Sequence, residues 1–229
     1  MIKTMTESLQ IPHMGYGDEV NMNALMECRR QVATNKEQRL SVLVYCIKAT
    51  SLALLDYPQL NSTLCTDTMT LKQSSSHHIG IAMDTPRGLA VPIVRHVESL
   101  SLLEISTELN RLKELAKDGA LSEQDVGAGA SSSSATFTLS NIGAVGGGTY
   151  MSPVVAPPQV GIGAMGKVRR LPRFVDNDED DSLEVEAAHM MNISWAADHR
   201  AVDGATLARF SNTWKAYLES PTSMMMKMK

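Results

Sequence analysis

Hydrophobic residues recur along this chain with helical spacing in some stretches and with strand-like alternation in others. A run rich in Leu, Val, Ile and Ala spans residues 40–55 and ends just before Pro58, so it predicts a buried helix. Apolar residues at helical spacing over 99–117, followed by Gly119, predict a second helix that ends in a glycine C-cap. Further helices are expected at residues 21–30 and 205–218.

Strand patterns fill much of the remaining chain. Short alternating or β-rich stretches predict strands at 61–73, 79–84, 89–94, 135–140, 160–168 and 187–195, and an edge strand or an arm at 8–13. Turn-forming residues follow at 85–88 and 143–148. Because helices and strands mix without strict alternation, we expect an α+β fold or a mixed-sheet sandwich.

Composition narrows the class of protein. With 229 residues, 43% hydrophobic and 20% charged, the chain can form one large globular domain or two small ones. A net charge of -4 and 4% aromatic residues argue against a nucleic-acid partner. Cys28, Cys46 and Cys65 have neither zinc-site nor disulfide-framework spacing. We expect no membrane span, since no apolar run reaches about 20 residues, and the first residues do not read as a signal peptide.

One histidine stands in a pattern that suggests chemistry. His199 follows a strand-like run, lies between Asp198 and Arg200, and precedes Asp203-Gly204 at the start of a predicted helix. An imidazole with an ordinary pKa of about 6.5 can accept a proton near neutrality. A purely structural interpretation fits the spacing equally well: Asp203 as a helix N-cap, and Asp198 with Arg200 as a surface ion pair. The other histidines are interpreted as structural: His13, His77, His78, His96 and His189.

A second stretch, Thr136 to Gly143, places Ser140 and Asn141 before a glycine-rich turn. A hydroxyl at such an edge can donate a hydrogen bond to a developing oxyanion, although the residues alone favour an ordinary turn. The glycines form no dinucleotide-binding pattern. We also expect no metal, because His189, His199 and Asp203 do not make a compact ligand set.

Taken together, four blocks resemble the catalytic domains of lipoamide acyltransferases, the core components of 2-oxo acid dehydrogenase complexes. They are IGIAMDTPRGLAVPIV (79–94), TFTLSNIG (136–143), PPQVGIGAMGK (157–167) and NISWAADHRAVDG (192–204). The last block carries the family's His-x-x-x-Asp-Gly motif. Residues 5–13, 194–195 and 209–215 look most like the branched-chain type.

This resemblance implies a fold and an assembly. The fold would be an α/β (α+β) two-layer sandwich like that of chloramphenicol acetyltransferase, with residues 1–229 as one catalytic domain and 1–20 as an N-terminal arm. Homotrimers with active sites between subunits would build a cage, expected to be a cube-like 24-mer. Lipoyl and subunit-binding domains are absent from this chain. Residues 127–134 and 175–184 look like insertions relative to the family.

The resemblance also implies an activity. The domain would transfer a branched-chain acyl group from acyl-dihydrolipoamide to coenzyme A, with His199 as general base, Ser140 of a neighbouring subunit stabilising the oxyanion, and Asp203 holding the loop. Coenzyme A contacts are expected at Arg29, Ser41, Asp84, Lys113, Ser140, Asn141, Gly166 and Val168. Acetyl or succinyl transfer, a different acceptor as in chloramphenicol acetyltransferase, and a silent scaffold paralogue are the alternatives.

Expected partners follow from the same family. They are lipoyl domains that lie outside this chain and the decarboxylase and dihydrolipoamide dehydrogenase components of the complex. The location would be the mitochondrial matrix in a eukaryote and the cytoplasm in a bacterium.

Overall fold

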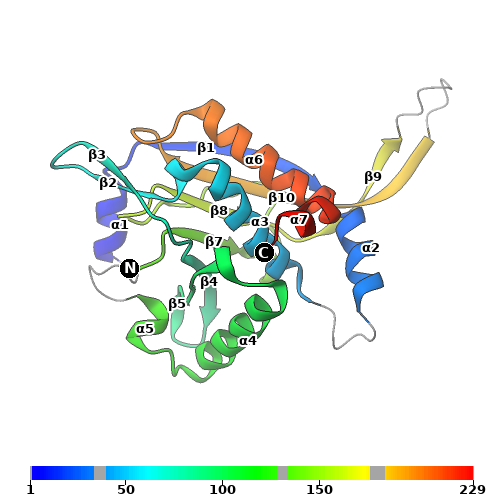
Figure 1. Cartoon of the computed structure of the whole chain (residues 1–229), viewed down its shortest axis with the longest axis horizontal. Coiled ribbons are helices and arrows are strands. Elements are labelled where there is room, and N and C mark those ends of the chain that lie inside the picture. The colour runs from blue at the N-terminus through cyan, green and yellow to red at the C-terminus, as the bar shows by residue number, and fades with distance from the viewer. Residues whose placement is uncertain (1, 34–39, 128–133, 176–183, 229) are drawn as a thin grey trace.

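A computed structural model describes residues 2–33, 40–127, 134–175 and 184–228. It consists of a mixed β-sheet with helices packed over one face (Figure 1). The helices are α1 (Ile2–Ser8), α2 (Asn23–Val32), α3 (Val42–Asp56), α4 (Leu102–Asp118), α5 (Glu123–Val126), α6 (Gly204–Glu219) and α7 (Pro221–Lys227). Short 3-10 turns lie at Pro58–Leu60, Val97–Ser99 and Ile142–Ala144.

The main sheet has the strand order β1-β10-β8-β7-β4-β5, while β6 pairs with β4 and β9 with β10. Its strands are β1 (His13–Asn21), β4 (Ile79–Thr85), β5 (Gly88–Ala90), β6 (Ile93–Val94), β7 (Phe137–Asn141), β8 (Gly161–Met165), β9 (Arg169–Val175) and β10 (Glu184–Asp198). Strand β7 runs parallel to β4 and β8, and the other pairs are antiparallel. The expected mixed sheet under a helical layer is therefore confirmed.

An aromatic cluster joins the sheet to the helices. Trp195 of β10 packs edge-on against Phe210 and Trp214 of α6, with ring centroids 5.0 and 5.1 Å apart. Its indole N–H donates to the hydroxyl of Ser211 at 3.0 Å, so this large side chain is buried with its one polar group satisfied. Helix α3 lies in the same core and is buried from Leu43 to Leu54, which explains its almost uniformly apolar sequence.

The predicted helices at 21–30, 40–55, 99–117 and 205–218 are confirmed as α2, α3, α4 and α6. Gly119 caps α4 with φ 65°, the left-handed conformation that glycine adopts without strain. The Cys46 thiol of α3 is fully buried, and burial raises its pKa to about 12.

Several strand predictions were wrong in detail. The stretch 61–73 is a hairpin of β2 (Ser62–Cys65) and β3 (Thr70–Gln73), because Thr66 to Met69 form a tight turn. The stretch 89–94 is divided between β5 and β6 around Pro92, which has no N–H to donate to a neighbouring strand. Strand β9 was missed, since its three arginines and one proline mask any alternation.

The N-terminal segment differs from the expectation as well. Within 8–13 only His13 is in a strand; α1 precedes it, and β1 continues to Asn21. Because β1 pairs with β10 along its whole length, the second half of the expected arm 1–20 is an edge strand of the main sheet. Most of the two expected insertions, 128–133 and 176–183, lies outside the described residues. None of the described helices combines the length and apolar character needed to cross a membrane.

The contact between β8 and Trp195 leads to a stability prediction. A Cβ at Gly163 would lie 2.6 Å from Cε3 of the buried Trp195 ring, so Gly163→Ala should destabilise the protein by about 1–3 kcal/mol through overpacking. Gly147→Ala is the matched control, because its Cβ would meet nothing within 4 Å. Urea denaturation of both variants measures the difference; equal midpoints would contradict the prediction.

Candidate active site

His199 lies in a tight turn between the end of β10 and the start of α6. The carbonyl of Asp198 accepts hydrogen bonds from the N–H groups of Ala201 and Val202, at 2.9 and 3.0 Å. The N–H of His199 donates to the carbonyl of Pro12 at 2.9 Å, which ties the turn to the segment before β1. This exposed histidine is thus presented on a backbone held by the sheet.

The His199 ring is oriented by one hydrogen bond. Its Nδ1 lies 3.0 Å from the carbonyl oxygen of Val202. A carbonyl can only accept, so Nδ1 carries the proton in the neutral ring, and Nε2 is left with its lone pair. The geometry therefore gives a neutral imidazole whose basic nitrogen is Nε2.

Asp203 is the N-cap of α6. Its carboxylate accepts hydrogen bonds from the N–H of Thr206 at 2.8 Å and from the Thr206 hydroxyl at 3.1 Å. The backbone bond first, and the hydroxyl second, hold the pKa of Asp203 below its ordinary value. An anionic cap cannot donate a proton at neutral pH, which leaves Asp203 a positioning role.

Asp198 and Arg200 form an ion pair, but not the surface pair that the spacing suggested. The Asp198 side chain is only 3% exposed. Burial opposes its ionisation, yet the hydrogen bonds from the Arg200 side chain and N–H outweigh burial and hold the pKa of this carboxyl below its ordinary value. The expected surface location was wrong for the carboxylate, because Asp198 is still paired in the sheet, opposite His13 of β1, and its N–H donates to the carbonyl of Val160 at 2.9 Å.

Within one chain Ser140 and His199 lie far apart. Ser140 pairs with Ala164 of β8, which pairs with Ser194 of β10. His199 follows Ser194 by five residues, so it lies about 16 Å further along the strand direction and two strands across. One copy of this chain cannot bring these two groups together.

Ser140 points away from the helices. Its neighbours Phe137 and Leu139 are in the core beneath the helical layer, and alternation puts Thr138 and Ser140 on the opposite face of the sheet. Among the described residues none hydrogen-bonds the half-buried Ser140 hydroxyl, which therefore can donate to a group brought against this face.

A cavity of about 190 Å³ gathers several of the expected coenzyme A contacts. The first turn of α3, Asn141, the turn at Gly143 and the backbone from Met165 to Val168 line it. Asn141, Gly166 and Val168 are thus brought together. Ser41 precedes the first turn of α3, and its buried hydroxyl has no hydrogen-bond partner in the described part of the chain.

Arg29 lies at the same end of α3, since its Nε donates to the carbonyl of Leu40 at 2.8 Å. Asp84 and Lys113 do not line the cavity. Asp84 is exposed on β4, two residues beyond the partner of Ser140, and Lys113 is exposed on α4.

The glycine-rich turn packs backbone against backbone. A Cβ at Gly143 would lie 2.6 Å from the carbonyl carbon of Gly166, and a Cβ at Gly166 would collide with the carbonyl oxygen of Gly148. Only glycine permits this approach. Sequence reasoning missed Lys167, which lines the cavity and whose N–H donates to Gly147 at 2.9 Å. It also missed the contact of Pro12 with the His199 turn, which only tertiary structure creates.

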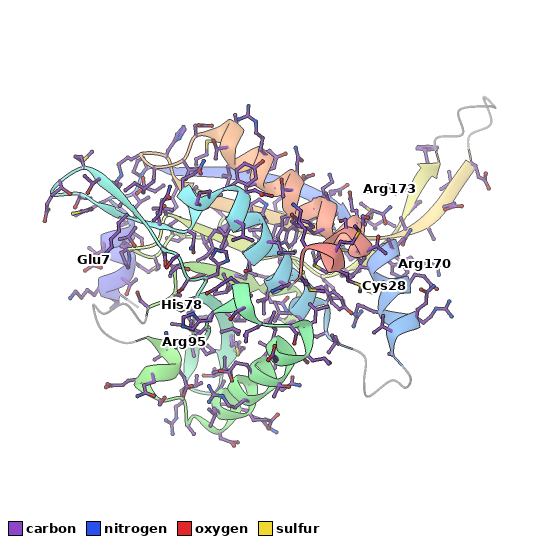
Figure 2. All side chains as sticks on the ribbon, in the orientation of Figure 1. Glu7, Cys28, His78, Arg95, Arg170 and Arg173 are labelled. Carbon is purple, nitrogen blue, oxygen red and sulfur yellow. The ribbon has the colours of Figure 1, made fainter. Side chains whose placement is uncertain are left out.

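The remaining histidines make hydrogen bonds typical of structural residues. His77 Nδ1 is 2.7 Å from the Ser51 hydroxyl, and His78 Nδ1 accepts from the N–H of His96 at 3.2 Å. Burial lowers the pKa of both His77 and His78, so both are neutral at physiological pH. Figure 2 shows Arg95 near His78, and the Arg95 side chain donates to the carbonyl of Gln124 in α5. In the described ranges no group of three or more His, Cys, Asp or Glu could hold a metal ion.

Residues 1–226 match the family model described as 2-oxoacid dehydrogenases acyltransferase (catalytic domain). The chain belongs to this family. Relatives include the lipoamide acyltransferase components of mitochondrial branched-chain alpha-keto acid dehydrogenase complexes from Caenorhabditis elegans, 49% identical, and Bos taurus, 47% identical. Both matches cover 100% of this chain, but 49% and 46% of the relatives, so the chain spans about half the length of the curated relatives it matches.

A dihydrolipoyllysine-residue acetyltransferase component of a pyruvate dehydrogenase complex from Staphylococcus aureus is 34% identical over 94% of this chain and 48% of the relative. The acetyltransferase is therefore a more distant relative than the two branched-chain components.

Solved structures of acyltransferases share the fold. A dihydrolipoamide acetyltransferase of Azotobacter vinelandii, studied for the role of a serine, a histidine and an asparagine in its catalytic mechanism, superposes with a TM-score of 0.86 at 29% identity, covering 98% of this chain and 88% of that one. The cubic core of a pyruvate dehydrogenase multienzyme complex gives 0.85 at 30% identity, with the same coverage. Chloramphenicol acetyltransferase gives 0.56 at 12% identity over 94% of both chains, which confirms the expected fold type.

The role of Asp203 as a cap can be separated from any chemical role. Asp203→Ala should lower the Tm of the protein by a few degrees, because α6 loses its N-cap, whereas Asp203→Asn keeps an acceptor for Thr206 and should leave the Tm nearly unchanged. Ser101→Ala is the control, since Ser101 caps α4 in the same way outside this turn. Differential scanning calorimetry measures all three; an equal loss for Asp203→Asn and Asp203→Ala would refute the capping role.

Proposed function

We propose that this domain transfers a branched-chain acyl group from acyl-dihydrolipoamide to coenzyme A. The observation that carries the proposal is the His199 ring, whose Nδ1 is bonded to the Val202 carbonyl so that Nε2 is the basic nitrogen. Such a base, presented at the surface on a rigid turn, suits the removal of a proton from a thiol that arrives from outside.

The reaction needs this base because a protonated thiol is a poor nucleophile. Nε2 of His199 takes the proton of the coenzyme A thiol, and the thiolate sulfur attacks the carbonyl carbon of the acyl thioester. The bond from that carbon to the dihydrolipoamide sulfur then breaks, and the imidazolium returns its proton to the leaving thiolate. One thioester is exchanged for another, so positioning and charge stabilisation provide the catalysis.

The tetrahedral intermediate carries an oxyanion, and Ser140 of a neighbouring subunit donates a hydrogen bond to it. The separation of Ser140 and His199 within one chain supports a site shared between two copies. A well-placed donor of this kind contributes about 3 kcal/mol. Asp203, four residues after His199, holds the start of α6; the acetyltransferase of Azotobacter vinelandii has its histidine and asparagine at the same spacing.

Part of coenzyme A binds in the cavity at the start of α3. Asn141 offers a polar contact there, and the unpaired Ser41 hydroxyl lies just before the turn of α3 that lines the cavity. Arg29 supplies positive charge for the nucleotide end. Gly166 and Val168 provide the wall. The remaining proposed coenzyme A contacts are Asp84 of β4 and Lys113 of α4, which lie outside this cavity.

The assembly follows from the same relatives. We propose residues 1–229 as a single catalytic domain that forms a homotrimer, with trimers building a cube-like 24-mer, as the cubic core among the solved relatives suggests. Lipoyl domains carry the acyl group to the site, and the decarboxylase and dihydrolipoamide dehydrogenase components join the complex. The mitochondrial names of the eukaryotic relatives support the matrix as the location.

The branched-chain type is favoured over the acetyl type by sequence identity, which is 49% against 34% for the respective relatives. The decisive test is an acyl-transfer assay to coenzyme A with isobutyryl, acetyl and succinyl dihydrolipoamide as donors. The expected order places isobutyryl first. A preference for succinyl or acetyl groups would reject the branched-chain assignment and leave acyl transfer itself standing.

His199→Ala should lower kcat roughly 10²- to 10⁴-fold, because no base remains for the thiol proton. His96→Asn is the control, since His96 is exposed and Asn tolerates its left-handed backbone. Steady-state acyl transfer measures both variants, with light scattering to verify assembly. Full activity of His199→Ala would reject His199 as the base, whereas assembly without acyl transfer in the unmodified chain would favour the scaffold alternative.

Ser140→Ala should lower kcat by roughly 10² to 10³, the usual effect of losing one oxyanion donor. Co-assembly of Ser140→Ala with His199→Ala chains should restore activity, because in a random mixture about a quarter of the shared sites combine an intact His199 with an intact Ser140. The measurement is acyl transfer by co-expressed chains against each variant alone. If the activity of the co-expressed chains does not exceed the summed activities of the two variants, both groups of a site belong to one chain.

A further inference from the structure

We propose that Asp198 and Arg200 are positioning residues that fix the direction and the tautomer of His199. This inference rests on the proposed function for its catalytic readout, but it concerns contacts that exist within one chain. The two side chains flank His199 in sequence, and the backbone between them forms the turn that carries the base.

Arg200 holds the Asp198 carboxylate through three donors. Its Nε lies 2.9 Å from Oδ1, its Nη2 lies 2.6 Å from Oδ2, and its backbone N–H donates to Oδ1 at 3.0 Å. A bidentate guanidinium fixes the plane of a carboxylate as well as its distance, which a single lysine donor cannot do. The third bond, from the main chain, ties the backbone just after His199 to the same carboxylate.

The main-chain carbonyl of Asp198 also stabilises the turn, because it accepts hydrogen bonds from the N–H groups of Ala201 and Val202. Val202 is the residue whose own carbonyl accepts from His199 Nδ1. Two successive hydrogen bonds therefore connect Asp198 to Val202 and Val202 to the imidazole of His199. Arg200 binds the Asp198 side chain and so fixes the position of Asp198, the residue from which these hydrogen bonds start.

Burial separates this pair from an ordinary surface ion pair. Asp198 is 3% exposed, while Arg200 is 33% exposed and reaches it from the solvent side. Removing Arg200 would leave a buried carboxylate short of donors, a state that proteins avoid by rearrangement. A reacting group beside it is then displaced, and a shift of about 1 Å can cost 10²-fold in rate.

The kinetic test uses acyl transfer by the full chain. Arg200→Ala and Asp198→Asn should each lower kcat roughly 10- to 100-fold with little change in the KM for coenzyme A, because the base and not the binding cavity is disturbed. Arg200→Lys should retain an intermediate kcat. Guanidinium chloride at low, non-denaturing concentration should restore part of the activity of Arg200→Ala, which a general loss of stability would not permit.

Arg30→Ala is the matched control. Arg30 pairs with Glu27 at 2.7 Å on α2, but this pair is exposed and borders neither the turn nor the cavity. Its loss should leave kcat unchanged. If Arg200→Ala fails to fold, Arg200→Lys and Asp198→Asn carry the same test.

A second measurement is independent of activity. Solid-state NMR of ¹⁵N-histidine-labelled protein should show His199 with a protonated Nδ1 and an unprotonated Nε2, assigned by comparison with His199→Gln. In Arg200→Ala the His199 signals should shift toward the other tautomer. Unchanged signals together with unchanged kcat would overturn the proposal, whereas absence of acyl transfer in the unmodified chain would reject the proposed function and leave the NMR test valid.

Discussion

Main-chain pairing along β10 fixes the position of the turn that carries His199. This fifteen-residue strand pairs with β1 on one side and with β8 and β9 on the other. Asp198, the last residue of β10, accepts the hydrogen bonds that shape the His199 turn. Trp195 of the same strand is buried in the core. A slip of one residue would exchange the two faces of the strand and bury the wrong side chains.

The core enforces that register. Trp195 fills the space between β8 and α6, and Gly163 is a glycine because the indole ring occupies the place of a side chain. Strand register, aromatic packing and the direction of α6 are therefore mutually dependent. Since α6 begins at the Asp203 cap, the same packing also sets where the His199 turn must end. A catalytic loop built this way gains precision from the scaffold and needs few side-chain contacts of its own.

The same register separates the two candidate groups. Ser140 lies on β7 and His199 follows the end of β10, with β8 between these two strands, so the two residues lie toward different ends of the sheet. The face that carries Ser140 is opposite the helices, and small residues such as Ala164 and Ser194 line it. The proposed shared site would link catalysis to assembly, because a domain that must pair to react is active only where copies are concentrated.

Local sequence determined the four longest helices (α2, α3, α4 and α6), the glycine cap at Gly119, the mixed class of sheet and the residues of the His-x-x-x-Asp-Gly motif, because each depends on periodicity or on a short pattern of residue types. It did not predict the shorter helices α1, α5 and α7. It did not determine the hairpin within 61–73, the break at Pro92 or strand β9, since these depend on which neighbours are available for pairing. The motif identified His199, yet only the tertiary structure decided its tautomer, through a carbonyl three residues away, and the burial of Asp198, through the layers around β10. Contacts between distant segments, such as Pro12 with His199, leave no local pattern, and so the sequence by itself named the residues while the fold decided their geometry.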